Sequence, residues 1–410
     1  MANYAESDVV ITGLGITSAI GQGKNDFFSA LVKGQTSFGI MKRPGRQNGT
    51  SFIGAEINNL RSVDSLSSKR AYRTASFSSQ VGLVTLHEAW SEARLYEVEP
   101  DRIGFIVGGS NFQQREMLNL YDKYGQQPDY ITPTYGFSFM DSDLCGLCTE
   151  EFGIRGMAFT IGGASASGQL AVIQAIQAIN SGQVDTCIVM GALMDLSYLE
   201  CQALRSLGAM GSDKYNRDPD KACRPFDLDR DGFIFGESCG VIIIEKAVSA
   251  QKRCVTPYAK IRGWAVGGDG NRNPNPSYEG EKRVIKQALE IGRLSPDQID
   301  YIKPHGTGSL IGDEIELKAI KDFEFSNAYI NTTKSIIGHG LSAAGAVEII
   351  ATVLQMEKST LHPSRNLINP IDTSLNWIRD KSISTNIQTA ICLSMGFGGV
   401  NTALCLENLH

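Results

Sequence analysis

Short apolar runs bounded by glycine alternate along the chain with longer segments whose apolar residues recur at helical spacing. The runs that we predict to be strands are residues 9–13, 103–109, 187–191 and 241–245. Residues 169–180 are predicted to form a helix, because their apolar residues share one face and Gly182 stands where a C-terminal cap is expected. Strands that alternate with helices indicate an α/β fold.

The same order of elements begins again after a charged stretch at residues 245–253. The predicted elements of this second series are a strand at 258–261, a helix at 282–291 and a strand at 300–302. We therefore expect two fused, duplicated α/β halves, residues 1–250 and 251–410. No low-complexity or Ser/Pro-rich tether separates them, which argues against independent domains on a flexible linker.

The composition indicates a globular protein whose overall charge does not favour nucleic acid. Of 410 residues, 42% are hydrophobic and 20% are charged, which is enough apolar material for a core and excludes wholesale disorder. The formal net charge of −6 gives no long-range attraction for a polyanion. No run approaches the roughly 18 consecutive apolar residues of a membrane span, and the first ten residues lack the basic and apolar blocks of a signal peptide. We expect a cytoplasmic protein with no nucleic-acid or membrane partner.

The nine cysteines are scattered, and several lie inside apolar runs, as buried thiols in a reducing compartment would. Their pattern indicates no disulfide framework. Cys145 and Cys148 form a lone CxxC pair, but no second cysteine pair or nearby histidine completes four metal ligands. We predict no metal site.

A glycine-rich segment after the first predicted strand partly imitates a dinucleotide-binding fingerprint. Gly13 and Gly15 are present, but Ser18 replaces the third glycine and no acidic residue follows a second strand. The pattern instead predicts a tight turn in which glycine permits a positive φ.

A run of small residues at 161–168 joins a predicted strand to the helix that follows. A nucleophile on such a bend gains from the helix N-terminal amides, whose partial positive charge stabilises an oxyanion or a thiolate. Ser165 is the candidate for this position. The alternative interpretation is that Ser165 or Ser167 only caps the helix.

Two of the five histidines, His305 and His339, stand in glycine-rich segments of the second half. Lys334 precedes the second histidine by five residues. Near the end of the chain, residues 394–401 form a glycine-hinged loop that contains one aromatic residue, Phe397. Lone histidines are usually structural, but this combination favours a functional site.

Taken in series, these motifs resemble the β-ketoacyl-acyl-carrier-protein synthases of the thiolase superfamily over nearly the whole chain. Residues 224–227, 230–233 and 236–237 match the family in order and spacing, as does Glu316, eleven residues after His305. The resemblance implies a five-layered αβαβα fold made of two related halves. It also implies a homodimer and an acyl carrier protein as partner.

The chain departs from the family at the nucleophile, because Ser165 occupies the position of the condensing enzymes' cysteine. A thiol with an ordinary pKa of about 8.5 becomes a thiolate near neutrality at a helix N-terminus, whereas a hydroxyl needs an adjacent general base. An oxyester is also a poorer acyl donor for carbon–carbon bond formation than a thioester. We therefore predict that condensation is crippled.

Decarboxylation of a malonyl thioester, the other half of the family reaction, needs no nucleophile. The resemblance implies that His305 and His339 donate hydrogen bonds to the enolate oxygen that forms when CO2 leaves. Each donor contributes roughly 2.7 to 4 kcal/mol, by analogy with oxyanion holes. Phe397 is expected to provide an apolar wall against water, and both histidines argue against a purely structural subunit.

The remaining site residues follow from the resemblance. Glu316 and Lys334 match a buried family pair that orders the histidine loops. Thr307 and Ser309 match positions that hydrogen-bond the pantetheine arm, and Met395 replaces the usual phenylalanine of a gating loop. The substrate is carried on the phosphopantetheine of the carrier protein, so no free cofactor is expected.

The predicted function is a ketosynthase-like decarboxylase that converts malonyl-acyl carrier protein to acetyl-acyl carrier protein, resembling the serine-bearing enzymes of polyketide β-branching cassettes. Three alternatives remain. The chain could be a condensing enzyme whose cysteine was changed to Ser165, a serine acyltransferase or thioesterase, or a non-catalytic chain-length subunit. Its G-x-S-x-S-G run departs from the G-x-S-x-G elbow, which weakens the second alternative.

A basic cluster is the candidate docking site for the acidic carrier protein. It consists of Lys69, Arg70 and Arg73, and relatives use basic residues at the first and third of these positions. The alternative is an ordinary solvated helix face.

Overall fold

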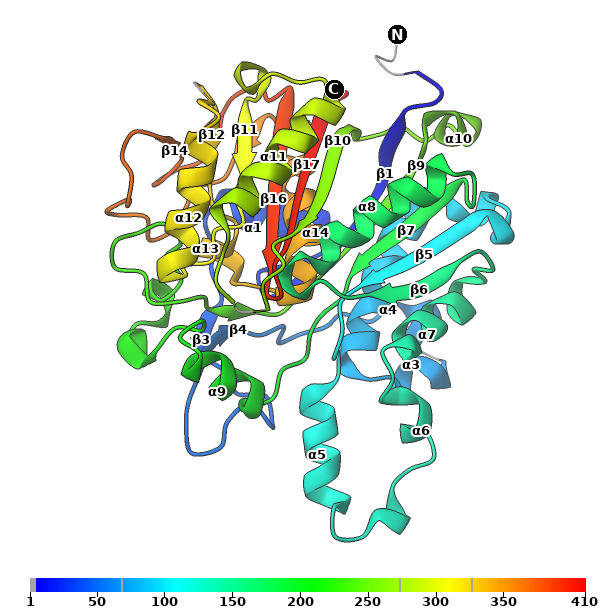
Figure 1. The fold of residues 1–410 in the computed structure, drawn as a ribbon. Helices are drawn as coiled ribbons and strands as arrows, with labels where there is room; N and C mark the ends of the chain where they lie inside the picture. The colour runs from blue at the N-terminus through cyan, green and yellow to red at the C-terminus, as the bar shows by residue number, and fades with distance from the viewer. Residues whose placement is uncertain (1–4, 68, 273, 326) are drawn as a thin grey trace.

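The strands form two sets that meet where β1 pairs with β10 (Figure 1). The structure is a computed structural model that describes residues 5–67, 69–272, 274–325 and 327–410. The first set, in spatial order, is β1 (Val9–Ser18), β9 (Ser238–Lys246), β7 (Thr186–Gly191), β5 (Ile103–Gly108) and β6 (Ala158–Ile161). The second set is β10 (Ala259–Gly268), β17 (Val400–Asn408), β16 (Thr389–Gly396), β11 (Tyr301–Lys303) and β12 (Tyr329–Ile330). The shorter strands are β2 (Gly21–Gln22), β3 (Phe38–Ile40), β4 (Ile53–Ala55), β8 (Phe235–Gly236), β13 (Thr360–Leu361), β14 (Asn376–Trp377) and β15 (Ile383–Ser384).

The two sets repeat the same pairing directions. From β1 outward the successive pairs are antiparallel, antiparallel, parallel and parallel, and the same order of directions starts from β10. The predicted boundary after residue 250 lies within α10 (Ala247–Lys252), on the segment that joins β9 to β10. The division into halves 1–250 and 251–410 remains a prediction.

Helices occupy three layers around the two sets of strands (Figure 1). The central layer consists of α8 (Ser167–Asn180) and α14 (Ala344–Glu357), which contact each other between the sets. The outer layers are α4 (Phe77–Glu92) and α7 (Ser142–Phe152) on the first set, and α11 (Tyr278–Gly292) and α12 (Leu310–Lys321) beside the second. Nearly every residue of α14 is buried, as expected of a helix covered on all sides. The arrangement is the five-layered αβαβα architecture that the family resemblance implies.

Several strands are longer than predicted, among them β1, β9 and β10, and the first one overturns an expectation. Gly13 and Gly15 lie inside β1 and not in a tight turn, and neither has a positive φ. They are needed because α4 packs directly on the strand: a Cβ on Gly15 would lie 2.1 Å from the carbonyl oxygen of Thr85. Gly263 of β10 has the same relation to α11, with a Cβ 2.1 Å from the carbonyl oxygen of Ala288. Glycine here permits a close helix approach.

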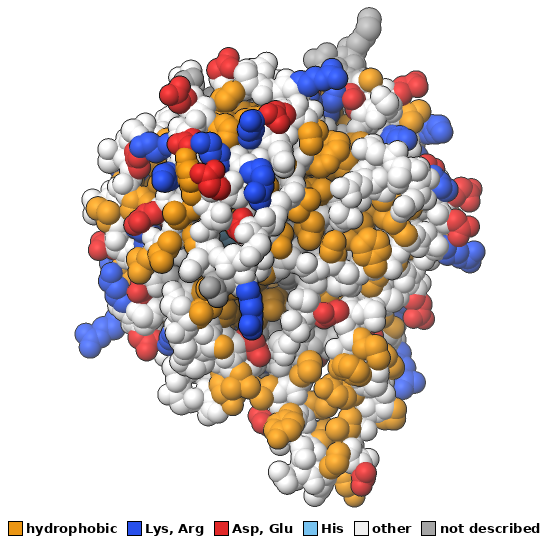
Figure 2. Space-filling model, in the orientation of Figure 1, with side chains coloured by type: hydrophobic (Ala, Val, Ile, Leu, Met, Phe, Trp, Pro, Cys, Tyr) orange, Lys and Arg blue, Asp and Glu red, His pale blue; other side chains and the backbone are white. Residues whose placement is uncertain are grey.

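One segment projects from the layered body at the bottom of Figure 1. It carries α5 (Gln114–Tyr124) and α6 (Tyr135–Ser138) and returns through α7 to β6. Apolar side chains gather on this projection (Figure 2). Its large exposed apolar residues are Tyr121, Tyr130, Phe137, Phe139 and Met140.

The cysteines are all unpaired, and only Cys254 is exposed. Cys145 and Cys148 are buried on α7. Across the described ranges, no three His, Cys, Asp or Glu side chains gather as a metal site would require. In the same part of the chain, no helix combines the length and the apolar character needed to span a bilayer.

Candidate active site

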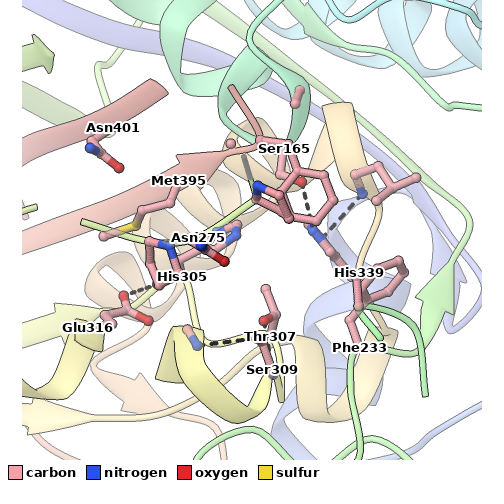
Figure 3. Close-up of a pocket in the computed structure, with 18 of the residues that line it drawn as sticks. Ser165, Phe233, Asn275, His305, Thr307, Ser309, Glu316, His339, Met395 and Asn401 are labelled. Carbon is pink, nitrogen blue, oxygen red and sulfur yellow. Dashed lines mark hydrogen bonds between the residues drawn. The ribbon is translucent and has the colours of Figure 1, made fainter. Parts of the chain in front are cut away.

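A cavity of about 220 Å³ is lined by residues from both sides of the predicted boundary at residue 250 (Figure 3). The first half contributes Ser165 to its wall. The second half contributes most of the other predicted site residues, namely His305, Thr307, Ser309, Glu316, His339, Met395 and Phe397. The structure therefore brings together residues that lie up to 232 positions apart, from Ser165 to Phe397.

Ser165 lies on a single 3-10 turn, Ala164–Ala166, directly before α8. Its hydroxyl oxygen is 2.9 Å from Nε2 of His339, and the two side chains face each other in Figure 3. The capping interpretation is wrong for both serines, because α8 has no side-chain cap. Ser167 instead accepts a hydrogen bond from the backbone N–H of Gly163 at 2.8 Å and donates to the carbonyl of Ala164 at 2.7 Å.

The hydrogen bonds of His339 fix where its proton lies. Its Nδ1 accepts from the backbone N–H of Leu341 at 3.3 Å, so the proton is on Nε2, which donates to Ser165. Burial, with Lys334 as a second cause, holds the pKa of His339 well below its usual 6.5. His339 is therefore a neutral hydrogen-bond donor directed into the cavity. The ring of Phe233 packs edge-on against it, with centroids 5.2 Å apart.

His305 has the same protonation pattern. The ammonium of Lys334 lies 3.4 Å from its Nδ1 and also donates to its carbonyl oxygen, which leaves the ring proton on Nε2. Burial first, and then the positive charge of Lys334, holds the pKa of His305 well below 6.5. The two histidine rings lie 5.4 Å apart and nearly perpendicular. Two neutral Nε2–H donors thus share one cavity.

Glu316 and Lys334 hold the His305 loop but do not pair with each other. Glu316 accepts from the backbone N–H groups of His305 at 2.5 Å and Gly306 at 2.8 Å, and burial raises its pKa to about 7. Lys334 forms its ion pair with Glu348 of α14 at 2.8 Å, and no ion pair joins it to Glu316 within the described residues. Both residues are buried and contact the His305 loop, as the resemblance implies, but each does so separately.

Glu348 is the site residue that the sequence interpretation missed. It is a carboxylate in the middle of a predominantly apolar helix, and that contrast was the available signal, because a buried charge needs a partner. Besides Lys334, it lies 3.8 Å from the buried ammonium of Lys303. Burial, only partly offset by Glu348, lowers the pKa of Lys303 to about 8.

The predicted pantetheine and gating residues all line the cavity. The Ser309 hydroxyl accepts from the N–H of Gly312 as the cap of α12, and Thr307 accepts from the N–H of Ser309, both at 3.2 Å. Each hydroxyl keeps a proton that it can donate. Phe397 remains 43% exposed, so it forms an apolar wall only in part.

The basic cluster lies outside the cavity, at and before α3 (Arg70–Thr74). Lys69, Arg70 and Arg73 are exposed. Lys69 forms an ion pair with Glu151 of α7.

Comparison with known proteins adds to this geometry. Residues 6–250 match the family "Beta-ketoacyl synthase, N-terminal domain", and residues 258–368 match "Beta-ketoacyl synthase, C-terminal domain". The chain is 62% identical over 403 residues to the "Polyketide biosynthesis malonyl-ACP decarboxylase PksF" of Bacillus subtilis (strain 168), covering 98% of this chain and 97% of that protein. It is 30% identical over 410 residues to "3-oxoacyl-[acyl-carrier-protein] synthase 2" of Coxiella burnetii, covering 98% of each chain.

A solved structure confirms the predicted fold. It holds a "type II PKS acyl-carrier protein in complex with its ketosynthase bound to the hexaketide". The TM-score is 0.86 at 27% identity, over 98% of this chain and 100% of that one.

The ion pair of Lys334 and Glu348 yields a stability prediction. Glu348→Gln removes the carboxylate that faces two buried ammonium groups, so we expect the free energy of unfolding to fall by about 3 kcal/mol or more. Urea denaturation measures this change. Glu357→Gln, at the less buried end of the same helix, is the control and is expected to change stability by under about 0.5 kcal/mol. Equal stabilities of the two variants would contradict the assignment.

Proposed function

The chain belongs to the β-ketoacyl synthase family, and we propose that within it this protein decarboxylates malonyl-acyl carrier protein to acetyl-acyl carrier protein without condensation. One observation carries the proposal: Ser165 stands at the nucleophile position, while both cavity histidines are neutral Nε2–H donors. The 62% identity to a protein named as a malonyl-ACP decarboxylase supports it.

The chemistry requires charge stabilisation at one oxygen. When the bond between Cα and the carboxyl carbon breaks, its electron pair moves into an enolate whose negative charge rests on the thioester oxygen, and CO2 leaves. The Nε2–H groups of His305 and His339 donate to that oxygen. Because the site is buried, such preorganised donors act more strongly than they would in water. A proton then adds to Cα and gives the acetyl thioester.

Ser165 lacks the base that acyl transfer needs. A serine nucleophile is activated when a neighbouring nitrogen lone pair accepts its proton. The nitrogen that faces Ser165 is Nε2 of His339, which carries a proton because Nδ1 accepts from Leu341. This pattern argues against the serine acyltransferase and the condensing enzyme. The cavity and its paired donors argue against a non-catalytic subunit.

We place the reaction in polyketide β-branching, as the sequence resemblance implies, and in the cytoplasm, where nine unpaired cysteines would remain reduced. The substrate arrives on the phosphopantetheine arm of the carrier protein, and we propose that Thr307 and Ser309 hydrogen-bond that arm. The proposed chemistry uses no free cofactor.

The exposed edge strand β6 supports a homodimer. Strand β6 is the last strand of the first set, and Phe159 on it is 40% exposed. The adjoining projection adds further exposed apolar side chains (Figure 2). An unpaired edge beside such a patch invites association, and a two-fold partner would cover both features at once.

The function is tested by incubating the protein with malonyl-acyl carrier protein and following the mass of both proteins. We expect loss of CO2 from the carrier and no acyl ester on the enzyme. Ser165→Ala should retain much of the activity, because the hydroxyl is not a nucleophile here. His305→Ala or His339→Ala should reduce kcat about 10²-fold or more. Loss of activity in Ser165→Ala, together with an acyl ester that accumulates on the wild-type enzyme, would instead identify nucleophilic catalysis.

The docking cluster is tested by charge reversal. Arg70→Glu is expected to weaken binding of the holo-carrier protein about tenfold, or roughly 1.4 kcal/mol, because like charges then face each other. Titration calorimetry measures the Kd. The difference from wild type should shrink at high salt. Lys286→Glu, a charge reversal at an exposed position on α11, is the control and should bind like wild type. Unchanged affinity in Arg70→Glu would remove this cluster from the docking surface.

The homodimer is tested by analytical ultracentrifugation. We expect wild type to sediment at twice the mass of one chain, and Phe159→Asp to shift toward the monomer because it places a charge beside the sheet edge. Tyr96→Asp is a matched control, since Tyr96 is a 65% exposed aromatic residue elsewhere on the surface. A monomeric wild type would overturn the proposal.

A further inference from the structure

Glu281 is a buried acid in the cavity wall that the mechanism above leaves unused. It lies in the first turn of α11, its side chain is only 2% exposed, and it lines the same cavity as the two histidines. Its Oε2 has no hydrogen-bond partner among the described residues. A buried carboxyl oxygen without a partner is costly, and such a group in a cavity calls for a functional reason.

Tight packing at the start of α11 holds Glu281 in this wall. Ser277 caps the helix by accepting from the N–H of Gly280 at 3.1 Å. A Cβ on Gly280 would lie 1.8 Å from Oδ1 of Asp269, which itself accepts from the amide of Asn401 at 2.7 Å. The backbone next to Glu281 is therefore packed closely against Asp269.

The charges around Glu281 are negative. Asp269 faces it from the end of β10, and Asp313 and Glu316 face it from α12. On its own helix, Lys282 is paired with Asp322, and Arg283 donates to the carbonyl of Gly268. Burial, and then these three carboxylates, raise the pKa of Glu281 well above 4.5. Burial and the surrounding negative charge therefore favour the protonated, uncharged form of this carboxyl.

The proposed decarboxylation needs a proton that the two histidines are not placed to give. Their Nε2–H groups are committed to the enolate oxygen, whereas the proton must reach Cα. Without an acyl-enzyme to capture Cα, protonation is the step that completes turnover. Of the acids lining the cavity, Glu316 accepts two backbone N–H groups and Asp313 accepts three, including those of Phe226 and Gly308.

We propose that Glu281 is the general acid that protonates Cα of the enolate, directly or through one water molecule; this assignment rests on the proposed decarboxylation. The O–H bond of Glu281 breaks, its proton forms the new C–H bond with the enolate electron pair, and a carboxylate remains. Solvent returns the proton before the next turnover. The balance is one proton taken up for each CO2 released, and the three neighbouring carboxylates favour rapid reprotonation.

Glu281→Gln tests the assignment, because glutamine keeps the shape and the neutral charge but has no acidic proton. We expect kcat for CO2 release from malonyl-acyl carrier protein to fall about 10²-fold, at the lower end of general-acid effects. Glu279→Gln, an exposed glutamate in the same helical turn, is the control and should match wild type. A Glu281→Gln variant within threefold of wild type would overturn the proposal.

Two further readouts separate proton donation from a structural role. The wild-type kcat should fall as pH rises through the pKa of Glu281, because the carboxylate cannot donate, and the residual rate of Glu281→Gln should lack that fall. In equal parts of H2O and D2O, the deuterium content of the acetyl product should differ between wild type and Glu281→Gln. A wild-type kcat that stays level across alkaline pH would overturn the proposal even if the variant did not fold.

The outcomes also distinguish this proposal from the function on which it rests. If wild type releases no CO2 from malonyl-acyl carrier protein, the proposed function fails. If wild type is active and Glu281→Gln equals it in rate, pH profile and deuterium content, only the role of Glu281 fails.

Discussion

The site depends on one buried positive charge, the ammonium of Lys334. It donates toward Nδ1 of His305 and to the same residue's carbonyl, and its charge disfavours protonation of both cavity histidines. The ammonium is tolerated in the interior because Glu348 lies 2.8 Å away. Without this pair, His305 would lose the contact that fixes its tautomer, and only His339, whose Nδ1 accepts from Leu341, would remain a preorganised donor.

The similarity of the two sets of strands and helices explains why Ser165 and His339 lie beside each other. Both central helices begin after the same 3-10 turn, and each turn starts with a non-glycine residue at positive φ: Ala164 at 47° before α8 and Leu341 at 51° before α14. The first turn presents Ser165 to the cavity. In the second turn, the corresponding Ser342 donates to the carbonyl of Ala192 and leaves the cavity to His339, two residues before Leu341. The site forms where two similar helix N-termini converge.

Sequence patterns predicted the features that depend on interactions between residues close together along the chain. The predicted strands and helices, the small residues around Ser165 and the glycine settings of the histidines all depend on neighbours along the chain. The features that were predicted wrongly or overlooked depend on contacts between residues that are far apart in the sequence. The Gly13 segment continues as a strand because α4 packs on it, and Glu348 matters because Lys334 faces it from another element. The histidine tautomers likewise follow from partners that no spacing specifies.

The same geometry explains why a serine suits a decarboxylase. The hydroxyl of Ser165 accepts the Nε2–H of His339, and this hydrogen bond holds the ring in its orientation. When the thioester oxygen takes over that proton, one hydrogen bond replaces another and little free energy changes in the ground state. The donor then gains strength as negative charge develops on the oxygen. Because Ser165 carries no acyl group, the enolate meets no electrophilic carbonyl, which leaves protonation as its outcome.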